Sequence, residues 1–143
     1  MKINLTQNKN FKLFKIISKV AQENNQTVYI VGGYVRDLLM QRKAPTDIDF
    51  VTEQSGIELA KAVGKELGDL KVSVFKTYGT AMIKYKDLDL EFVGARKESY
   101  SEDSRKPAVE TGTLEDDQKR RDFTVNALAI SLNAENFGEL IDP

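Results

Sequence analysis

The sequence predicts one α+β domain in which a mixed β-sheet is flanked by helices. Three observations carry this prediction. The chain has 143 residues, about the length of one compact domain, and 41% of them are hydrophobic. Segments with helical spacing of apolar residues alternate with short β-branched runs. Two strand candidates, 80–85 and 88–93, flank a Lys86-Asp87 turn, which indicates a hairpin and excludes a purely parallel sheet.

The first half of the chain is expected to contain three helices and two strands. Apolar residues recur at helical spacing over about 8–24, where Phe11, Phe14 and Ile17 share one face. The run 27–31 is β-branched and too short for a helix, so a buried strand is expected there. A helix over 34–41 and a strand over 47–51 follow. Ser55 is the expected N-cap of a third helix that runs to Leu67.

The second half is expected to begin with strands over 72–76, 80–85 and 88–93. Residues 96–113 contain few large apolar side chains, which is typical of a functional or disordered segment, and a flexible loop is expected there. A helix over about 114–126 and a strand over 127–132 close the chain. Because no internal repeat or low-complexity tract divides the sequence, residues 1–143 are expected to form a single domain.

The chain contains neither cysteine nor histidine. Without cysteine it has no disulfide, no thiol nucleophile and no Cys-based zinc or iron–sulfur site. Without histidine it has no Ser-His-Asp catalysis and no imidazole acid–base chemistry. The 22 Asp and Glu residues remain, and carboxylate oxygens favour hard cations such as Mg²⁺.

Charge and hydropathy limit the expected partners. The net charge of −1 argues against a free-standing nucleic-acid-binding domain, because such domains are usually strongly basic. Five lysines and no acid occur within residues 1–20, and they are expected to form a solvated helix face. No apolar run approaches the roughly 20 residues that span a bilayer, and no signal-peptide pattern opens the chain. A cytoplasmic protein without a membrane partner is therefore expected.

A double glycine separates a predicted strand from a predicted helix. Gly32 and Gly33 allow the backbone to adopt positive φ and to approach a ligand closely. Arg36 follows within the first turn of the helix, where its guanidinium can bind phosphate oxygens in a bidentate manner. The pattern is typical of a phosphate-binding turn, although a tight turn without a ligand has the same residues.

Acidic residues alternate with apolar residues on two predicted strands. Asp47 and Asp49 share one strand face, and their mutual repulsion is offset if they bind a pair of Mg²⁺ ions. On the strand over 88–93, Asp89 and Glu91 share a face in the same way. If the two strands are neighbours, Asp89 or Glu91 completes a metal-binding triad, and the pattern alone does not choose between them. The alternative for both strands is a solvated polar face.

Two adjacent arginines precede the last predicted strand, in Arg120-Arg121-Asp122-Phe123-Thr124-Val125-Asn126-Ala127. Arginines beside an acid are typical of a triphosphate clamp. They are equally typical of a helix end at which the acids over 115–117 supply ion-pair partners four residues away.

These motifs occur in a particular order along the chain. Gly32-Gly33-Tyr34-Val35-Arg36-Asp37 is followed by Asp47-Ile48-Asp49, then by the segment 90–96 and then by the segment 120–127. In this order they resemble the head domain of the bacterial tRNA nucleotidyltransferase and poly(A) polymerase family, within the DNA polymerase β-like nucleotidyltransferase superfamily. The resemblance covers about residues 27–143 and implies the fold of that superfamily. Tyr34 departs from the small residues that are frequent in the family at this position.

The resemblance implies a metal-dependent transfer of nucleotides. Asp47 and Asp49 would bind two catalytic Mg²⁺ ions, and Glu91 matches the third acidic position better than Asp89 does. An RNA 3′ hydroxyl would attack the α-phosphate of CTP or ATP and release pyrophosphate. The nucleotide-binding residues that the resemblance implies are Gly32, Gly33, Arg36, Arg121, Asp122 and Asn126. The polar stretch 96–113 corresponds to a flexible loop that moves during polymerisation.

In this family a Glu-Asp-x-x-Arg motif selects the base, on a helical domain that follows the head. Further domains hold the tRNA, and this sequence ends at Pro143 before any of them, so the neck, body and tail domains are expected to be absent from it. The segment 115–119 is a near match to the motif but lies before the arginine pair, so we interpret it as coincidental. CCA addition, addition of C or A alone, and poly(A) synthesis therefore all stay open. A non-catalytic nucleotide-binding module is the alternative from another class, and the oligomeric state is not indicated.

Overall fold

The computed structural model describes residues 1–143 except 44, 100–107, 121–126 and 143. A seven-stranded mixed sheet forms its centre, with the strand order β3-β4-β5-β2-β1-β8-β9. The sheet strands are β1 (Tyr29–Val31), β2 (Asp47–Thr52), β3 (Val72–Phe75), β4 (Thr80–Tyr85), β5 (Leu88–Gly94), β8 (Ala129–Ser131) and β9 (Leu140–Ile141). β2 and β5 pair in parallel, and the other neighbours in this sheet pair antiparallel. The fold is therefore α+β, as the hairpin over 80–93 predicts.

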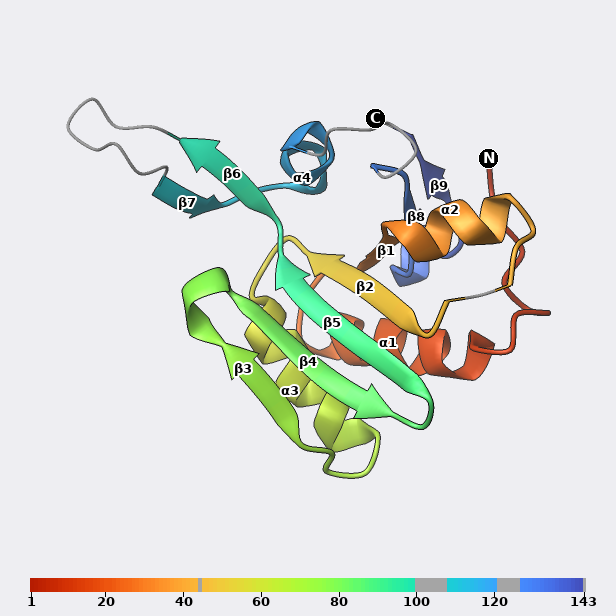
Figure 1. The fold of residues 1–143 in the computed structure, drawn as a ribbon, viewed down its shortest axis with the longest axis horizontal. Coiled ribbons are helices and arrows are strands. Elements are labelled where there is room, and N and C mark those ends of the chain that lie inside the picture. Colours follow the sequence, from red (N-terminus) through yellow and green to blue (C-terminus); the bar gives the residue numbers. More distant parts are fainter. Residues whose placement is uncertain (44, 100–107, 121–126, 143) are drawn as a thin grey trace.

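Two of the described helices cover one face of this sheet. The helices are α1 (Phe11–Glu23), α2 (Gly33–Leu39), α3 (Gly56–Glu66) and α4 (Leu114–Arg120), with 3-10 turns η1 (Lys76–Tyr78) and η3 (Ala134–Asn136). Figure 1 shows α1 and α3 side by side behind the strands. Their apolar sides join the inward residues of the sheet in one core, in which Phe50 stacks on Phe92 at 5.0 Å between ring centroids and Phe14 contacts Phe50 edge-on at 6.4 Å.

The start of α3 is set by two local features. The Ser55 hydroxyl accepts a hydrogen bond from the Glu58 backbone N–H at 3.1 Å, which satisfies one of the free amides of the first turn. Gly56 lies so close to β5 that a Cβ at this position would be 2.7 Å from the Val93 carbonyl carbon. Glycine therefore allows α3 to pack directly on the strand that carries Glu91.

The opposite face of the sheet is covered over only part of its area. A second apolar cluster there consists of Tyr29, Val31, Val51, Ala95, Leu114 and Ala129. The α4 helix supplies Leu114 to this cluster, and the Glu53 carboxylate accepts the Leu114 backbone N–H at 2.9 Å. Within the described part of the chain, the carboxylates of β2 and β5 stay exposed or half-buried beside this cluster.

The structure confirms most of the predicted elements and adds strands that were not predicted. The segment 96–113, where a flexible loop is expected, contains two strands that were not predicted: β6 (Arg96–Ser99) and β7 (Ala108–Thr111) pair antiparallel as a ribbon that extends away from the main sheet (Figure 1), and the mobility of the segment stays a prediction. The helix expected over 114–126 is described only as α4, and residues 121–126 lie outside the described part. The last sheet strand, β9, and the Lys2–Glu139 bridge were not predicted. Among the described helices none has the length and apolarity to cross a membrane.

Candidate functional site

The pairing of β2 with β5 brings four carboxylates together on the sheet face that α1 and α3 leave uncovered. Asp47 lies opposite Asp89 and Asp49 lies opposite Glu91 in the parallel register. Neighbouring strands are about 4.8 Å apart, so the two acidic pairs form a compact group at the backbone level. The intervening residues Ile48 and Leu90 point to the helical layer and are buried. β2 and β5 are therefore neighbours, which is the condition that a metal-binding triad of these acids requires.

The Gly32 turn lies against one of these carboxylates. β1 ends at Val31, which pairs with Asp49, so the chain turns directly beside that residue. Gly32 has φ 79° and ψ −146°, a backbone conformation that only glycine adopts readily. A Cβ on Gly32 would lie 3.3 Å from Asp49 Oδ2. The absence of a side chain at residue 32 thus allows the turn to approach the Asp49 carboxylate.

Arg36 folds back over the same turn. A Cβ on Gly33 would lie 3.3 Å from Arg36 Nη2, which places the guanidinium beside the Gly33 backbone. The Arg36 Nε donates a hydrogen bond to Asp37 Oδ1 at 3.2 Å, and the Arg36 side chain is 37% exposed. The turn therefore has one oriented cation on its surface, next to the carboxylate group.

Tyr34 anchors the start of α2 to the segment that precedes α1. Its hydroxyl donates to Asn8 Oδ1 and accepts from Asn10 Nδ2, both at 3.1 Å. Its ring lies edge-on against Phe14 at 5.8 Å. The sequence pattern indicates only that Tyr34 is unusual, because Asn8 and Asn10 lie 26 and 24 residues away and nothing local links them to the turn.

The donor set of this site is made only of oxygen. Carboxylate oxygens are the ligands that Mg²⁺ prefers, and proteins usually bind this ion through one or two carboxylates, with water and substrate phosphates as the other ligands. Within the described ranges no group of three acidic side chains is close enough to bind a metal ion by itself. The site thus fits a Mg²⁺ ion that two carboxylates bind together with a phosphate, rather than a cation enclosed by protein alone.

The predicted residues Arg121, Asp122 and Asn126 lie outside the described residues. The described residues on either side of them are held by Gln118, whose side-chain amide donates to the Ala127 and Ile141 carbonyls at 3.0 Å each. Gln118 is buried, and the sequence analysis did not identify it because a glutamine on a short helix has no distinctive pattern. Gln118 therefore ties α4 both to Ala127 and to Ile141 of β9.

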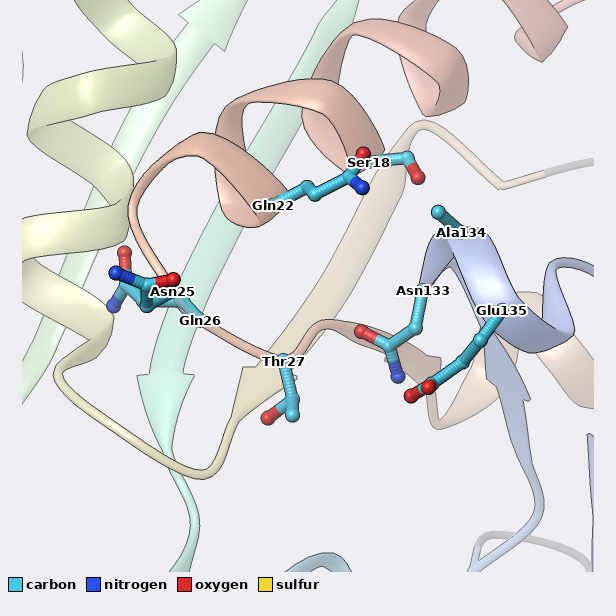
Figure 2. A pocket seen from close by; sticks show the side chains of 8 residues that line it. All are labelled: Ser18, Gln22, Asn25, Gln26, Thr27, Asn133, Ala134 and Glu135. Atoms are coloured by element: carbon cyan, nitrogen blue, oxygen red, sulfur yellow. The ribbon is translucent and has the colours of Figure 1, made fainter.

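A different pocket lies at the opposite end of β1, where Thr27 precedes the strand. Figure 2 shows the amide, hydroxyl and carboxylate side chains around it, which come from the end of α1, the turn before β1 and η3. Nearby Tyr29 has a raised pKa because burial, and then the Glu53 and Glu135 carboxylates, disfavour the phenolate. No lysine or arginine lines the described part of this pocket, so it lacks the cations that a triphosphate requires.

Known proteins resemble this chain over most of its length. Residues 28–143 match the family described as the poly A polymerase head domain. The A-adding tRNA nucleotidyltransferase of Aquifex aeolicus is 48% identical over 114 residues, which are 80% of this chain and 14% of that protein. A solved structure of a tRNA-processing enzyme in an apo form covers all of this chain and 34% of its own, with 40% identity and a TM-score of 0.85.

A second solved structure is described as a tRNA nucleotidyltransferase in complex with a primer tRNA and an incoming ATP analog. It is 42% identical, covers 89% of this chain and 34% of its own, and has a TM-score of 0.76. The chain thus spans about a third or less of the length of these relatives. The resemblance inferred from the motif order is confirmed, and the chain belongs to the poly A polymerase head-domain family.

Proposed function

We propose that this chain is the catalytic head of a template-independent RNA nucleotidyltransferase that adds CMP and AMP from CTP and ATP to the 3′ end of tRNA. The observation that supports this most is the arrangement around Asp49, which faces Glu91 on β5 and the Gly32 turn on β1. Phosphoryl transfer uses carboxylates that hold metal ions and backbone that binds phosphate, and the proposed parts of both kinds are adjacent at Asp49.

Each part of the site has a separate role in this proposal. Asp47 and Asp49 would bind the Mg²⁺ ions, which supply charge neutralisation at the phosphate oxygens. Gly33 and Arg36 would bind the triphosphate, with Gly32 setting the turn. Glu91 would complete the acidic group, since it lies opposite Asp49, whereas Asp89 lies opposite Asp47. Arg121, Asp122 and Asn126 are proposed to complete the nucleotide site.

The proposed reaction is an in-line displacement at phosphorus. The RNA 3′ oxygen forms a bond to the α-phosphorus, and the bond from that phosphorus to the oxygen bridging to the β-phosphate breaks. Pyrophosphate leaves with the electron pair of the broken bond. The proton of the 3′ hydroxyl passes to a carboxylate of the acidic group or to water. The nucleoside monophosphate is thereby added to the RNA, and atoms and charges balance.

The choice of nucleotide is proposed to depend on parts of the protein beyond residue 143. The matched region is only 14% of the Aquifex relative and 34% of the second solved structure, and the sequence of this chain contains no Glu-Asp-x-x-Arg motif. Addition of A alone is a specific second candidate, because the Aquifex relative at 48% identity is described as A-adding. Incubation of the full-length protein with CTP, ATP or both, and with tRNAs that end before, within or after the two C residues, separates these candidates.

The catalytic proposal is tested by removing the acidic pair. The full-length protein with Asp47→Ala and Asp49→Ala is expected to lose nucleotide incorporation by at least about a thousandfold, because the metal ligands and their electrostatic effect are lost together. Glu66→Ala is the matched control, since Glu66 is an exposed acid at the end of α3 on the other side of the sheet. Unchanged incorporation by the double variant would refute the assignment and favour a non-catalytic module.

A further inference from the structure

The face that carries the acidic group continues beyond it onto β4 and β3. In the sheet register Glu91 lies opposite Met82, and Met82 lies opposite Ser73. In the adjacent row Asp89 lies opposite Lys84. Because residues in register share a face, one continuous surface runs from Asp49 to the edge of the sheet, over three strand spacings or about 14 Å.

A shallow hollow occupies this outer part of the face. The residues that line it on this face are Lys71, Ser73, Phe75, Met82, Lys84 and Asp89. Phe75 is 47% exposed, although the neighbouring β3 residues Val72 and Val74 pack against the core on the other face. An aromatic ring this exposed on a sheet contributes little to folding and is available for stacking.

The charges of the hollow are arranged by sign. Lys71 and Lys84 are exposed, and within the part of the chain that the structure describes they form no ion pair. By contrast, exposed Lys19, Lys61 and Lys119 each lie within 4 Å of a carboxylate on their own helix. The two lysines lie on the β3–β4 side, and the acids lie on the β2–β5 side. This separation suits a ligand with phosphates at one end and a reacting hydroxyl at the other.

The direction of the displacement indicates which substrate lies here. In an in-line displacement the attacking oxygen and the leaving oxygen are on opposite sides of the phosphorus. The Gly32 turn and Arg36 lie on the β1 side of Asp49. Since Gly33 and Arg36 are proposed to bind the triphosphate, its leaving group belongs on that side. The attacking hydroxyl must then approach from the other side, which is the side of β5 and β4.

We propose that the acceptor strip, defined as Lys71, Ser73, Phe75, Met82 and Lys84, binds the last unpaired nucleotides of the RNA acceptor. This inference rests on the proposed function. A base stacks on Phe75, and the lysines contact the phosphates that precede the 3′ hydroxyl. Stacking on an aromatic side chain beside backbone-binding cations is the usual way in which proteins bind single-stranded nucleic acid without reading a long sequence. The strip thereby directs the 3′ hydroxyl toward Asp49 and Glu91.

The test measures RNA binding and nucleotide use separately in the full-length protein. The probe is a short fluorescent single-stranded RNA that ends in two C residues. Phe75→Ala is expected to raise its dissociation constant, and the KM for the tRNA acceptor, on the order of tenfold, with the KM for the nucleotide unchanged. Phe75→Tyr keeps an aromatic ring and is expected to restore binding. Lys84→Ala is expected to lower the salt dependence of RNA binding by about 0.7 in log–log slope, since one phosphate contact is lost.

Lys12→Ala is the matched control, because Lys12 is an exposed lysine on α1, in the helical layer on the other side of the sheet. If Phe75→Ala and Lys84→Ala bind the RNA as tightly as Lys12→Ala does, the acceptor strip is overturned and another part of the protein covers this face. An equal rise in the KM values for RNA and nucleotide would also overturn it. If the wild-type full-length protein adds no nucleotide, the proposed function is refuted. The acceptor strip is still tested in that case, because the RNA-binding measurement does not depend on turnover.

Discussion

The two faces of β2 and β5 differ in burial and in charge, although the same two strands carry both. On one face Ile48, Phe50, Leu90 and Phe92 are 0% exposed and pack against the helical layer. On the other face the same two strands carry four carboxylates that are exposed or half-buried, followed by Val51 and Val93, which belong to the second apolar cluster or pack against it. Because side chains alternate along a strand, one pair of strands can place core residues on one face and acidic residues on the other.

This difference teaches where substitutions should affect folding and where they should affect reaction. The buried face gains free energy from apolar burial and close packing, so a truncation there leaves a cavity. The acidic face brings four like charges together, which favours a bound cation but contributes no packing. Strands that were selected for stability alone would not carry acids at paired register positions.

The largest expected effect comes from the buried face. Phe50→Ala removes a ring that contacts both Phe14 and Phe92, and it is expected to lower the free energy of unfolding by about 3–5 kcal/mol. Asp89→Asn, on the same pair of strands but on the acidic face, is expected to change it by less than about 0.5 kcal/mol. Urea denaturation followed by circular dichroism measures both. Comparable destabilisation by the two variants would show that the faces do not divide the roles in this way.

The second prediction divides the acidic face itself. Glu91→Gln is expected to lower kcat by about a hundredfold or more with little change in stability, because Glu91 lies beside Asp49 and the turn. Asp89→Asn is expected to lower kcat less than tenfold, because Asp89 lies beside Asp47 and Lys84, farther from the turn. Steady-state incorporation at saturating nucleotide distinguishes them. A larger loss in Asp89→Asn than in Glu91→Gln would reverse the assignment of the third carboxylate.

The third and smallest expected effect is at the Gly32 turn, which connects β1 to α2 beside the acidic face. Gly32→Ala forces a side chain into a positive-φ conformation and toward Asp49 Oδ2, so it is expected to cost about 1–3 kcal/mol in stability. It is also expected to raise the KM for the nucleotide, since the turn and the carboxylate must move apart. Gly68→Ala is the control, because Gly68 has φ 113° but no neighbouring atom within 4 Å of an added Cβ. If both variants raise the KM for the nucleotide equally, backbone strain alone would account for the effect.

Much of the fold could be predicted because the signals are local. The helical spacing of Phe11, Phe14 and Ile17, the Ser55 cap and the Lys86-Asp87 turn each lie within a few residues of the element that they determine. The strands within the polar stretch 96–113 were not predicted, for the opposite reason. Its two end segments gain stability as strands only by pairing with each other and by following β5, and composition alone does not report that pairing.

The same division holds for the candidate site. Alternation along the strands predicts that Asp47 and Asp49 share a face, and that Asp89 and Glu91 share one. The local pattern does not indicate that Asp49 lies opposite Glu91, that Tyr34 binds Asn8 and Asn10, or that Gln118 ties Ala127 to Ile141. These contacts join residues that are distant in the chain, so they depend on strand order and register.

By itself the sequence determined the chemistry: no thiol or imidazole, carboxylates at alternating positions, and a double glycine ahead of an arginine. Residue types and short-range spacing suffice for this, because they limit which functional groups exist and which face each occupies. Only the tertiary structure decided which acids lie opposite each other, how close the turn comes to Asp49, and which strands lie on the side of the acidic group away from that turn. Those outcomes follow from packing the helical layer on one face of the sheet, which selects a single strand order among the many that the local pattern allows.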